Sequence, residues 1–222
     1  MGDMAPGLLF VYTDVGDGPV DEAEYHDWYD HEHGPARLTV PGLTGACRYE
    51  ALDGLMPRWL ALYELDSPDV LDSAEYKAVV EGGSDRDKFI MSHLPTMDRR
   101  IYVQLSDDGF AGSAGPAPVI LAVANSVPLE TVDDITAWYE QEHIPMLLAV
   151  PGWQRIRRYQ LTGPAPLDGP GVGYLSLHEL AGPSVLEDPG YRAAVSTPWR
   201  DRIVSGALGR ERRVLGFRNS FC

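Results

Sequence analysis

The sequence lacks the short motifs by which many enzyme classes are recognised. It has no glycine-rich phosphate-binding loop, no GxSxG nucleophile elbow, no CxxC pair and no HExxH sequence. Nucleotide-dependent transfer, serine hydrolysis and structural zinc binding are therefore without support. Any chemistry must come from individual side chains that the fold brings together.

Cysteine and basic residues are scarce, and both shortages limit the environment and the partners. The two cysteines, Cys47 and Cys222, are too few for a disulfide framework, which favours a reducing, cytoplasmic location. The 18 basic residues are outnumbered by 33 acidic ones, which gives a net charge of −15. Such a charge repels phosphate backbones and anionic lipids, so we expect neither nucleic-acid nor membrane partners. The start of the sequence, with no basic segment and a short apolar run, is typical of neither a signal peptide nor a membrane span.

The dominant feature of the sequence is an internal repeat. Residues 28–42 read WYDHEHGPARLTVPG, and residues 138–152 read WYEQEHIPMLLAVPG. The similarity resumes as LALYEL at residues 60–65 against LSLHEL at residues 175–180. It extends over nearly the whole of each half, so we interpret the chain as two copies of one structural unit.

Each copy has the same expected order of elements, βαββαβ, which is that of the ferredoxin-like split βαβ unit. Apolar and alternating segments predict the strands, and amphipathic segments predict the helices. In the first copy we expect strands at residues 8–13, 43–50, 58–65 and 99–105, and helices at residues 21–33 and 68–81. In the second copy we expect strands at residues 119–125, 153–161, 173–180 and 211–217, and helices at residues 132–143 and from about residue 183.

The predicted fold class is α+β, with ferredoxin-like repeat 1 at residues 1–105, a linker at residues 106–118 and ferredoxin-like repeat 2 at residues 119–222. The linker is rich in Gly, Ser, Ala and Pro, and a long hairpin loop is expected at residues 162–172. A sheet with helices on one face needs a cover on its other face. We therefore expect the two repeats to close on each other as an intrachain dimeric α/β barrel.

The repeated motif WYxxEHxPxxLxVPG, with RY after it and LALYEL beyond, resembles the EthD-like, stress-responsive A/B-barrel branch of the dimeric α/β-barrel superfamily. The resemblance covers essentially the full chain, in tandem form. Members of the superfamily include cofactor-free or flavin-using oxygenases of aromatic polyketides, ring-opening enzymes of antibiotic pathways, polyketide cyclases, muconolactone-type isomerases and haem-binding enzymes. The resemblance therefore implies a fold more specifically than it implies an activity.

The first helix of each repeat carries candidate catalytic groups. At 100° per residue, Glu32 falls in the middle of an aromatic face with Trp28 and Tyr29. A carboxylate there is a candidate acid or base, unless it holds the scaffold through backbone groups or Arg48. Corresponding residues of the second repeat are Glu142, Trp138, Tyr139 and Arg158. We interpret the aromatic residues as core anchors that are also candidates for substrate contact.

Histidine follows this glutamate in both repeats, as His33 and His143. A histidine beside a cavity can move protons near neutral pH. The resemblance implies that the histidine at this helix position faces the ligand pocket and acts as a base. Its occurrence in both repeats leaves a structural role open, and we expect one of the two to be the base.

Differences between the repeats indicate where one copy has specialised. The first repeat has His26, Asp30, His31 and Arg37 where the second has Thr136, Glu140, Gln141 and Leu147, and His178 replaces Tyr63. His26, Asp30 and His33 lie on one helical stripe, which would allow a two-histidine, one-carboxylate metal set. Three residues along one helix rarely complete a site, so we predict no metal. His31 is expected to be solvated or at an interface.

The strand after the first helix carries Arg48 and Tyr49, repeated as Arg158 and Tyr159. Alternation places each Arg and its neighbouring Tyr on opposite faces of the sheet. One set is expected to line a pocket, where Arg holds an enolate or phenolate oxygen; the alternative is a salt bridge between repeats. Cys47 is interpreted as a small buried residue. The candidate catalytic residues are His33, His143, Glu32 and Arg48, and the candidate substrate contacts are Tyr29, Tyr49, Tyr63, His178, Trp28 and Tyr139.

We predict an oxygenase that acts on a hydrophobic aromatic, polyketide-type small molecule with a histidine base. No tightly bound cofactor is predicted, and diffusible reduced flavin is left open. The alternatives are a redox-neutral polyketide cyclase, dehydratase or isomerase, a haem enzyme with an axial histidine, and a non-catalytic small-molecule binding protein. A homodimer of duplicated chains is also left open.

Overall fold

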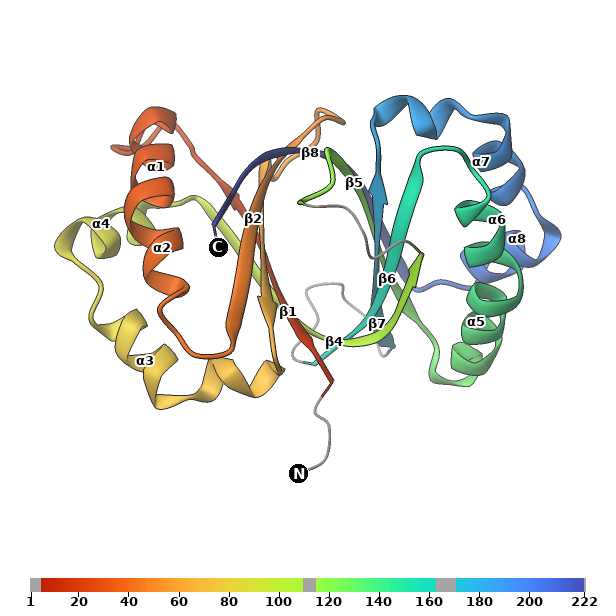
Figure 1. Cartoon of the computed structure of the whole chain (residues 1–222), viewed down its shortest axis with the longest axis horizontal. Coiled ribbons are helices and arrows are strands. Elements are labelled where there is room, and N and C mark those ends of the chain that lie inside the picture. The colour runs from red at the N-terminus through yellow and green to blue at the C-terminus, as the bar shows by residue number, and fades with distance from the viewer. Residues whose placement is uncertain (1–4, 110–114, 163–170, 222) are drawn as a thin grey trace. The chain divides into compact units, whose positions relative to one another are not determined.

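The computed structural model describes residues 5–109, 115–162 and 171–221, and it divides the chain into two compact units (Figure 1). Unit 1 consists of residues 1–103 and 218–222, and unit 2 consists of residues 104–217. Each unit contains a four-stranded antiparallel sheet with helices against one face. Within the described residues, no helix is both long enough and apolar enough to cross a membrane.

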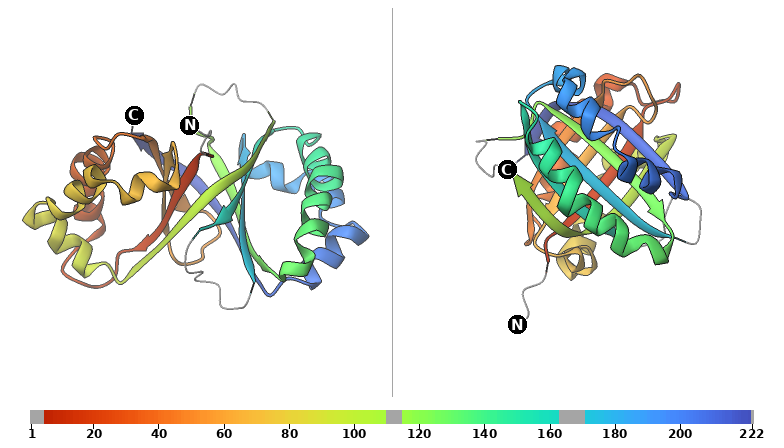
Figure 2. Two further views of the ribbon diagram at one scale, coloured as in Figure 1. Left: turned by 90° about the horizontal axis from the view of Figure 1, so that it is seen from below. Right: turned by 90° about the vertical axis from the view of Figure 1, so that its right-hand side faces the viewer.

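Unit 1 has the sheet order β4–β1–β3–β2, in which every neighbouring pair is antiparallel. Its strands are β1 (Gly7–Asp14), β2 (Leu43–Ala51), β3 (Trp59–Leu65) and β4 (Thr96–Gly109). Its helical segments are α1 (Glu22–Trp28), η1 (Tyr29–His33), α2 (Gly34–Arg37), η2 (Pro68–Asp72), α3 (Ala74–Glu81) and α4 (Asp85–His93). Figure 2 shows these helices, coloured red to yellow, gathered on one side of their strands.

Unit 2 has the equivalent sheet order β8–β5–β7–β6. Its strands are β5 (Val119–Val127), β6 (Trp153–Leu161), β7 (Val172–Leu180) and β8 (Gly209–Phe221), of which residues 218–221 belong to unit 1. Its helical segments are η3 (Leu129–Thr131), α5 (Val132–Trp138), η4 (Tyr139–His143), α6 (Ile144–Leu148), η5 (Pro183–Glu187), α7 (Pro189–Ala194) and α8 (Pro198–Ser205). Both units thus have the expected order βαββαβ, and the closure of the two units into one barrel stays a prediction.

Three segments differ from the sequence-based boundaries or lie outside the described residues. Strand β4 continues to Gly109, four residues into the predicted linker, and residues 110–114 of that linker are outside the described part of the chain. Residues 163–170 of the predicted hairpin loop and Cys222 are also outside it. The predicted helix at residues 68–81 is divided into η2 and α3, because Ser73 is extended and begins a new helix with its hydroxyl as N-cap.

The repeated WYxxEH motif forms a five-residue π-helical turn in both units, as η1 and η4. The backbone N–H of Gly34 donates to the carbonyl of Tyr29, and that of Ile144 donates to the carbonyl of Tyr139. A π turn contains more residues than an α turn, so the residues after Tyr29 are rotated away from their positions on an ideal α-helical wheel. This rotation decides which side chains of the motif face the sheet.

The core of unit 1 lies between this helix and the sheet. Tyr25, Trp28 and Ile90 are almost completely buried and pack in one cluster with Leu9 of β1. The end of the chain also packs on this helix: a Cβ atom at Gly34 would lie 2.7 Å from the ring of Phe221. Glycine at position 34 therefore allows the last residues of β8 to reach η1.

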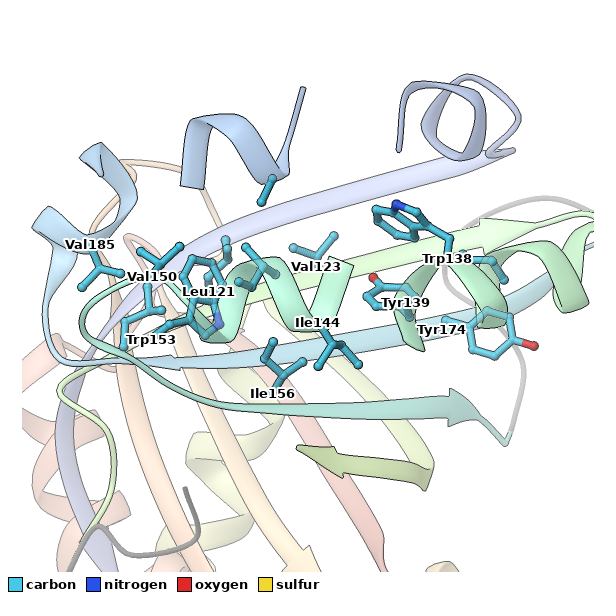
Figure 3. Close-up of a cluster of buried hydrophobic side chains, with 14 of the residues drawn as sticks. Leu121, Val123, Trp138, Tyr139, Ile144, Val150, Trp153, Ile156, Tyr174 and Val185 are labelled. Atoms are coloured by element: carbon cyan, nitrogen blue, oxygen red, sulfur yellow. The ribbon is translucent and has the colours of Figure 1, made fainter. Parts of the chain in front are cut away.

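The core of unit 2 is built in the same way (Figure 3). Trp138, Tyr139 and Ile144 of the helical layer face Val123 of β5 and Ile156 of β6. All five side chains are less than 10% exposed. Trp138 and Tyr139 thus occupy the core positions that Trp28 and Tyr29 hold in unit 1, whereas Ile135 stands at the position of Tyr25.

Candidate functional site

Unit 1 contains a cavity between its helical layer and its sheet. Leu9, Val11 and Thr13 of β1 form its floor, and His33 and Arg37 are on the helical side. Its volume is about 60 Å³, enough for a few water molecules, and most of its lining is apolar. It is a site with a small number of polar groups on an otherwise hydrophobic wall, which is the usual composition of a small-molecule site.

His33 is the central polar group of this cavity, and it is paired with a carboxylate. The Nδ1 atom of His33 is 2.9 Å from Oδ1 of Asp87, and the indole N–H of Trp28 donates to the same oxygen at 3.1 Å. The hydrogen bond from His33 lowers the pKa of Asp87, so this carboxyl group is ionised and can only accept. Nδ1 of His33 must therefore carry a proton.

Burial lowers the pKa of His33, although the hydrogen bond to Asp87 opposes this effect. The imidazole is therefore neutral at pH 7, with its proton on Nδ1. A neutral imidazole with a protonated Nδ1 has a lone pair on Nε2. His33 is consequently prepared to accept a proton at Nε2, and Asp87 stabilises the imidazolium that forms.

Asp87 is a site residue that the sequence did not reveal. It lies in the first turn of α4, where its backbone N–H donates to the N-cap hydroxyl of Ser84 at 3.0 Å. The spacing Ser84-x-x-Asp87 is that of an N-terminal capping pair, and it was the available sequence signal for a helix that begins here. It does not show that Asp87 meets His33, which lies 54 residues earlier in the chain.

Arg37 is the second polar group that distinguishes this cavity. Its side chain is only 7% exposed, and it lines both the cavity and a surface groove of about 300 Å³. Within the described residues, its guanidinium makes no hydrogen bond or ion pair. Its positive charge helps to lower the pKa of Asp87, and an anionic ligand could add charge-assisted hydrogen bonds to it. Arg37 is therefore available to bind a negatively charged oxygen.

Arg48 is the arginine predicted from the sequence to bind an oxygen anion, but its guanidinium is bound by other side chains of the protein. Its guanidinium lies 4.1 Å from the ring centre of Tyr29 and donates to Asp30 at 2.5 Å. Its Nη2 atom is 2.9 Å from Nδ1 of His26. Because His26 and Asp30 converge on Arg48 while His33 contacts Asp87, the three residues of the helical stripe do not converge on one point.

The position predicted for Glu32 on the aromatic face is wrong, and the π-helical turn is the reason. Glu32 is partly exposed and accepts a hydrogen bond from the hydroxyl of Ser84. Its counterpart Glu142 accepts from the hydroxyl of Thr197 at 2.5 Å and from Trp138 at 3.1 Å. Each glutamate thus joins the first helix of its unit to the N-cap of the last helix, which is a scaffold role.

Two tyrosines complete the cavity of unit 1. The hydroxyl groups of Tyr29 and Tyr63 form a hydrogen bond with each other, and burial raises the pKa of both. They remain protonated at neutral pH and can donate. Tyr49 is buried on the face of β2 opposite to Arg48 and does not line this cavity. His31 is 75% exposed, as expected for a solvated residue.

Unit 2 has an equivalent cavity of about 40 Å³, with different polar groups. His143 and Tyr139 occupy the positions of His33 and Tyr29, but Leu147 replaces Arg37. Arg200 replaces Asp87, since the N–H groups of both donate to the N-cap hydroxyl of their helix. Among the described residues, His143 therefore has no carboxylate partner, and the histidine that is paired with a carboxylate is His33 of unit 1.

The histidines of unit 2 predict a loss of stability in mild acid. Burial lowers the pKa of His143 to about 4 and that of His178 to about 3, whereas an unfolded histidine titrates near 6.5. Below about pH 6.5 the unfolded chain binds more protons than the folded chain, so the free energy of unfolding falls by up to about 1.4 kcal/mol per pH unit for each histidine.

Urea denaturation at pH 7 and pH 5 measures this loss. The variant His178→Tyr, which carries the residue found at the equivalent position of unit 1, is expected to lose less stability between the two pH values than the wild type. An identical loss in both proteins would show that His178 is not neutral in the folded state.

Comparisons with solved structures agree on the fold. An anthrone oxidase-like protein matches over 99% of this chain and 94% of its own length, with 13% sequence identity and a TM-score of 0.68. A monooxygenase-like protein from Listeria innocua matches over 98% and 96%, with 10% identity and a TM-score of 0.54. A ferredoxin fold protein from Listeria monocytogenes 4b F2365, related to antibiotic biosynthesis monooxygenases, matches over 98% and 97%, with 10% identity and a TM-score of 0.51.

These likenesses show that the chain has the same fold as these three proteins. No protein-family model and no curated protein matches the sequence. At this level of identity the shared fold does not assign a reaction, which must be argued from the cavity.

Proposed function

We propose that the chain is an oxygenase of hydrophobic, phenolic small molecules of the aromatic polyketide type, and that the cavity of unit 1 is its active site. The observation that carries the proposal is the His33–Asp87 pair, which prepares a neutral base beside the unpartnered guanidinium of Arg37. The names of the structural neighbours, which include anthrone oxidase-like and monooxygenase-like proteins, are consistent with this class.

The reaction begins with proton transfer. Nε2 of His33 accepts a proton from an acidic CH₂ or phenol group of the substrate, and Asp87 stabilises the imidazolium. The resulting enolate or phenolate oxygen is held by Arg37, and Tyr63 donates a hydrogen bond to it. These contacts delocalise the negative charge and make the ring system a better electron donor.

Dioxygen is the oxidant in the proposed reaction. One electron passes from the carbanionic substrate to O₂, and the radical and superoxide combine to form a C–O bond. The imidazolium of His33 returns its proton to give a hydroperoxide, which loses water to leave a carbonyl group. In sum, a CH₂ group and O₂ give C=O and H₂O, so the reaction needs no external reductant.

The proposed reaction needs no bound cofactor, and reduced flavin that diffuses in from solution is the alternative source of activated oxygen. In either case the residues of unit 1 perform the same steps: His33 moves the proton, and Arg37 holds the oxygen anion. We also propose, on the repeated WYxxEHxPxxLxVPG motif, that the chain belongs to the EthD-like branch in tandem form.

The cavity must widen to admit an aromatic ring. Met91, Leu94 and Met97 form part of its wall, and the side chain of Met97 is 48% exposed. Unbranched methionine side chains change conformation at low cost, so the side chains of this wall are the ones that move when a ligand enters. An apolar, adaptable wall opposite a fixed His33–Asp87 pair suits a flat hydrophobic substrate.

Oxygen uptake with anthrone as the probe tests the proposal. We expect the purified protein, without added flavin or metal, to consume one O₂ for each anthrone converted to the quinone. Product formed without oxygen uptake would instead indicate a redox-neutral cyclase, dehydratase or isomerase. Saturable binding of the probe without any product would indicate a binding protein.

A further inference from the structure

The cavity of unit 2 carries a concentration of positive charge that the proposed reaction does not use. Arg200, Arg210 and Arg212 line it, and its described lining contains no Asp or Glu side chain. Arg200 contacts the exposed Asp201 at 3.0 Å, and Arg212 contacts the hydroxyl of Tyr191 at 3.4 Å. Within the described residues, Arg210 makes no ion pair.

Arg210 is an exposed residue of β8 at the side of the cavity. Partial burial and the nearby charge of Arg200 lower its pKa. The two like charges repel each other, and the described lining of the cavity contains no carboxylate between them. An anion bound between the arginines would remove this repulsion and replace it with charge-assisted hydrogen bonds.

Two of the three arginines are particular to unit 2, whereas Arg212 corresponds to Arg99, which lines the cavity of unit 1 together with Arg37. Arg200 occupies the place of Asp87, and Arg210 occupies the place of Met97, because Met97 pairs with Thr13 of β1 as Arg210 pairs with Asn125 of β5. Both changes make the cavity of unit 2 more positive, and neither is required by a scaffold that unit 1 forms without them.

A buried histidine provides a second and independent indication of a ligand. His178 lines the cavity and is 2% exposed, and its Nδ1 atom has no hydrogen-bond partner among the described residues. A neutral imidazole can carry its proton on Nδ1 and donate it. The cavity is therefore lined by a neutral buried histidine of β7 that has an unused hydrogen-bonding atom, and by guanidinium groups of β8 and α8.

The remaining walls are aromatic and apolar. Trp138, Trp153 and Tyr191 line the cavity together with aliphatic residues of β5. The volume of about 40 Å³ fits a carboxylate-sized group, and the partly exposed arginine side chains can move to admit the body of a ligand. Flat aromatic side chains favour an organic anion with a flat apolar body over an inorganic one.

We propose that the cavity of unit 2 is a binding site for a small aromatic carboxylate, held by Arg200, Arg210 and the Nδ1 proton of His178. The site is separate from the proposed oxygenase cavity, and its test does not depend on the proposed oxygenase function. In this arrangement one unit of the repeat holds a base, whereas the other holds an anion.

Isothermal titration calorimetry of the full chain with benzoate tests the proposal. We expect saturable 1:1 binding that weakens at least about tenfold in Arg210→Met, which carries the residue present in unit 1. Arg192→Met removes the same charge from the exposed surface of α7 and is expected to change the affinity by less than about twofold. Arg37→Leu is also expected to leave the affinity unchanged, since Arg37 lies in unit 1.

Four results would overturn the proposal. The first is the absence of saturable benzoate binding to the wild type. The second is an equal loss of affinity in Arg210→Met and Arg192→Met, which would indicate a general charge effect. The third is loss of binding in Arg37→Leu, which would place benzoate in unit 1. Inorganic phosphate that binds as tightly as benzoate would show an adventitious ion only.

Discussion

Replacement of His33 by glutamine is expected to lower kcat for oxygen uptake by about 100- to 10,000-fold, the range typical of general-base catalysis. Glutamine fills a similar volume and can still donate to Asp87, so the hydrogen bond at that carboxylate is kept while the base is lost. The matched replacement His143→Gln in unit 2 is expected to change kcat by less than about threefold, because His143 has no carboxylate partner among the described residues and lies outside the proposed active site.

The comparison is made with the oxygen electrode and the anthrone probe, after thermal denaturation has shown that both variants are folded. The two substitutions affect equivalent positions of the repeat, so a purely structural role would reduce activity in both. Equal losses in the two variants would remove the assignment of unit 1 as the active copy. Full activity of His33→Gln would remove the base assignment itself.

Replacement of Arg37 by leucine, the residue at the equivalent position of unit 2, is expected to lower kcat by about 100- to 1,000-fold. In the proposed mechanism Arg37 holds the oxygen anion, and the loss of one such donor from a desolvated site has effects of this size. Because the guanidinium makes no hydrogen bond or ion pair among the described residues, its removal is expected to change the free energy of unfolding little.

Activity is thus predicted to fall while stability changes little, which distinguishes a functional arginine from a structural one. The measurements are kcat for oxygen uptake and the Tm of the same sample. Arg37→Lys keeps the charge without the planar fork and is expected to retain an intermediate rate. A fall in Tm of several degrees with unchanged kcat would show that Arg37 supports the fold and not the reaction.

The fold could be predicted because the same sequence pattern occurs in both halves of the chain. The repeated WYxxEHxPxxLxVPG motif and the matching strands give the order βαββαβ in each half, and the structure confirms that order in each unit. The boundary of β4 could not be read from composition, because the Ser-Asp-Asp-Gly segment that ends this strand has the polar character of a linker.

The site was predicted less completely, and each failure has a local cause. The helical wheel placed Glu32 among the aromatic residues because it assumed one pitch throughout, whereas η1 inserts a π-helical turn. Asp87 was missed because its contact with His33 joins distant segments. The sequence shows Arg37 as a difference between the repeats. It does not show that His26 and Asp30 bind Arg48 and leave the guanidinium of Arg37 free to bind a ligand.

The central claim is that His33 carries its proton on Nδ1, toward Asp87, and offers an unprotonated Nε2 to the cavity. Two-bond ¹H–¹⁵N spectra of the uniformly ¹⁵N-labelled protein, with His33→Gln to assign the signals, test it most directly. At pH 7 we predict that His33 is neutral and in the Nδ1–H tautomer. A His33 signal from the Nε2–H tautomer, or from an imidazolium, would contradict the account.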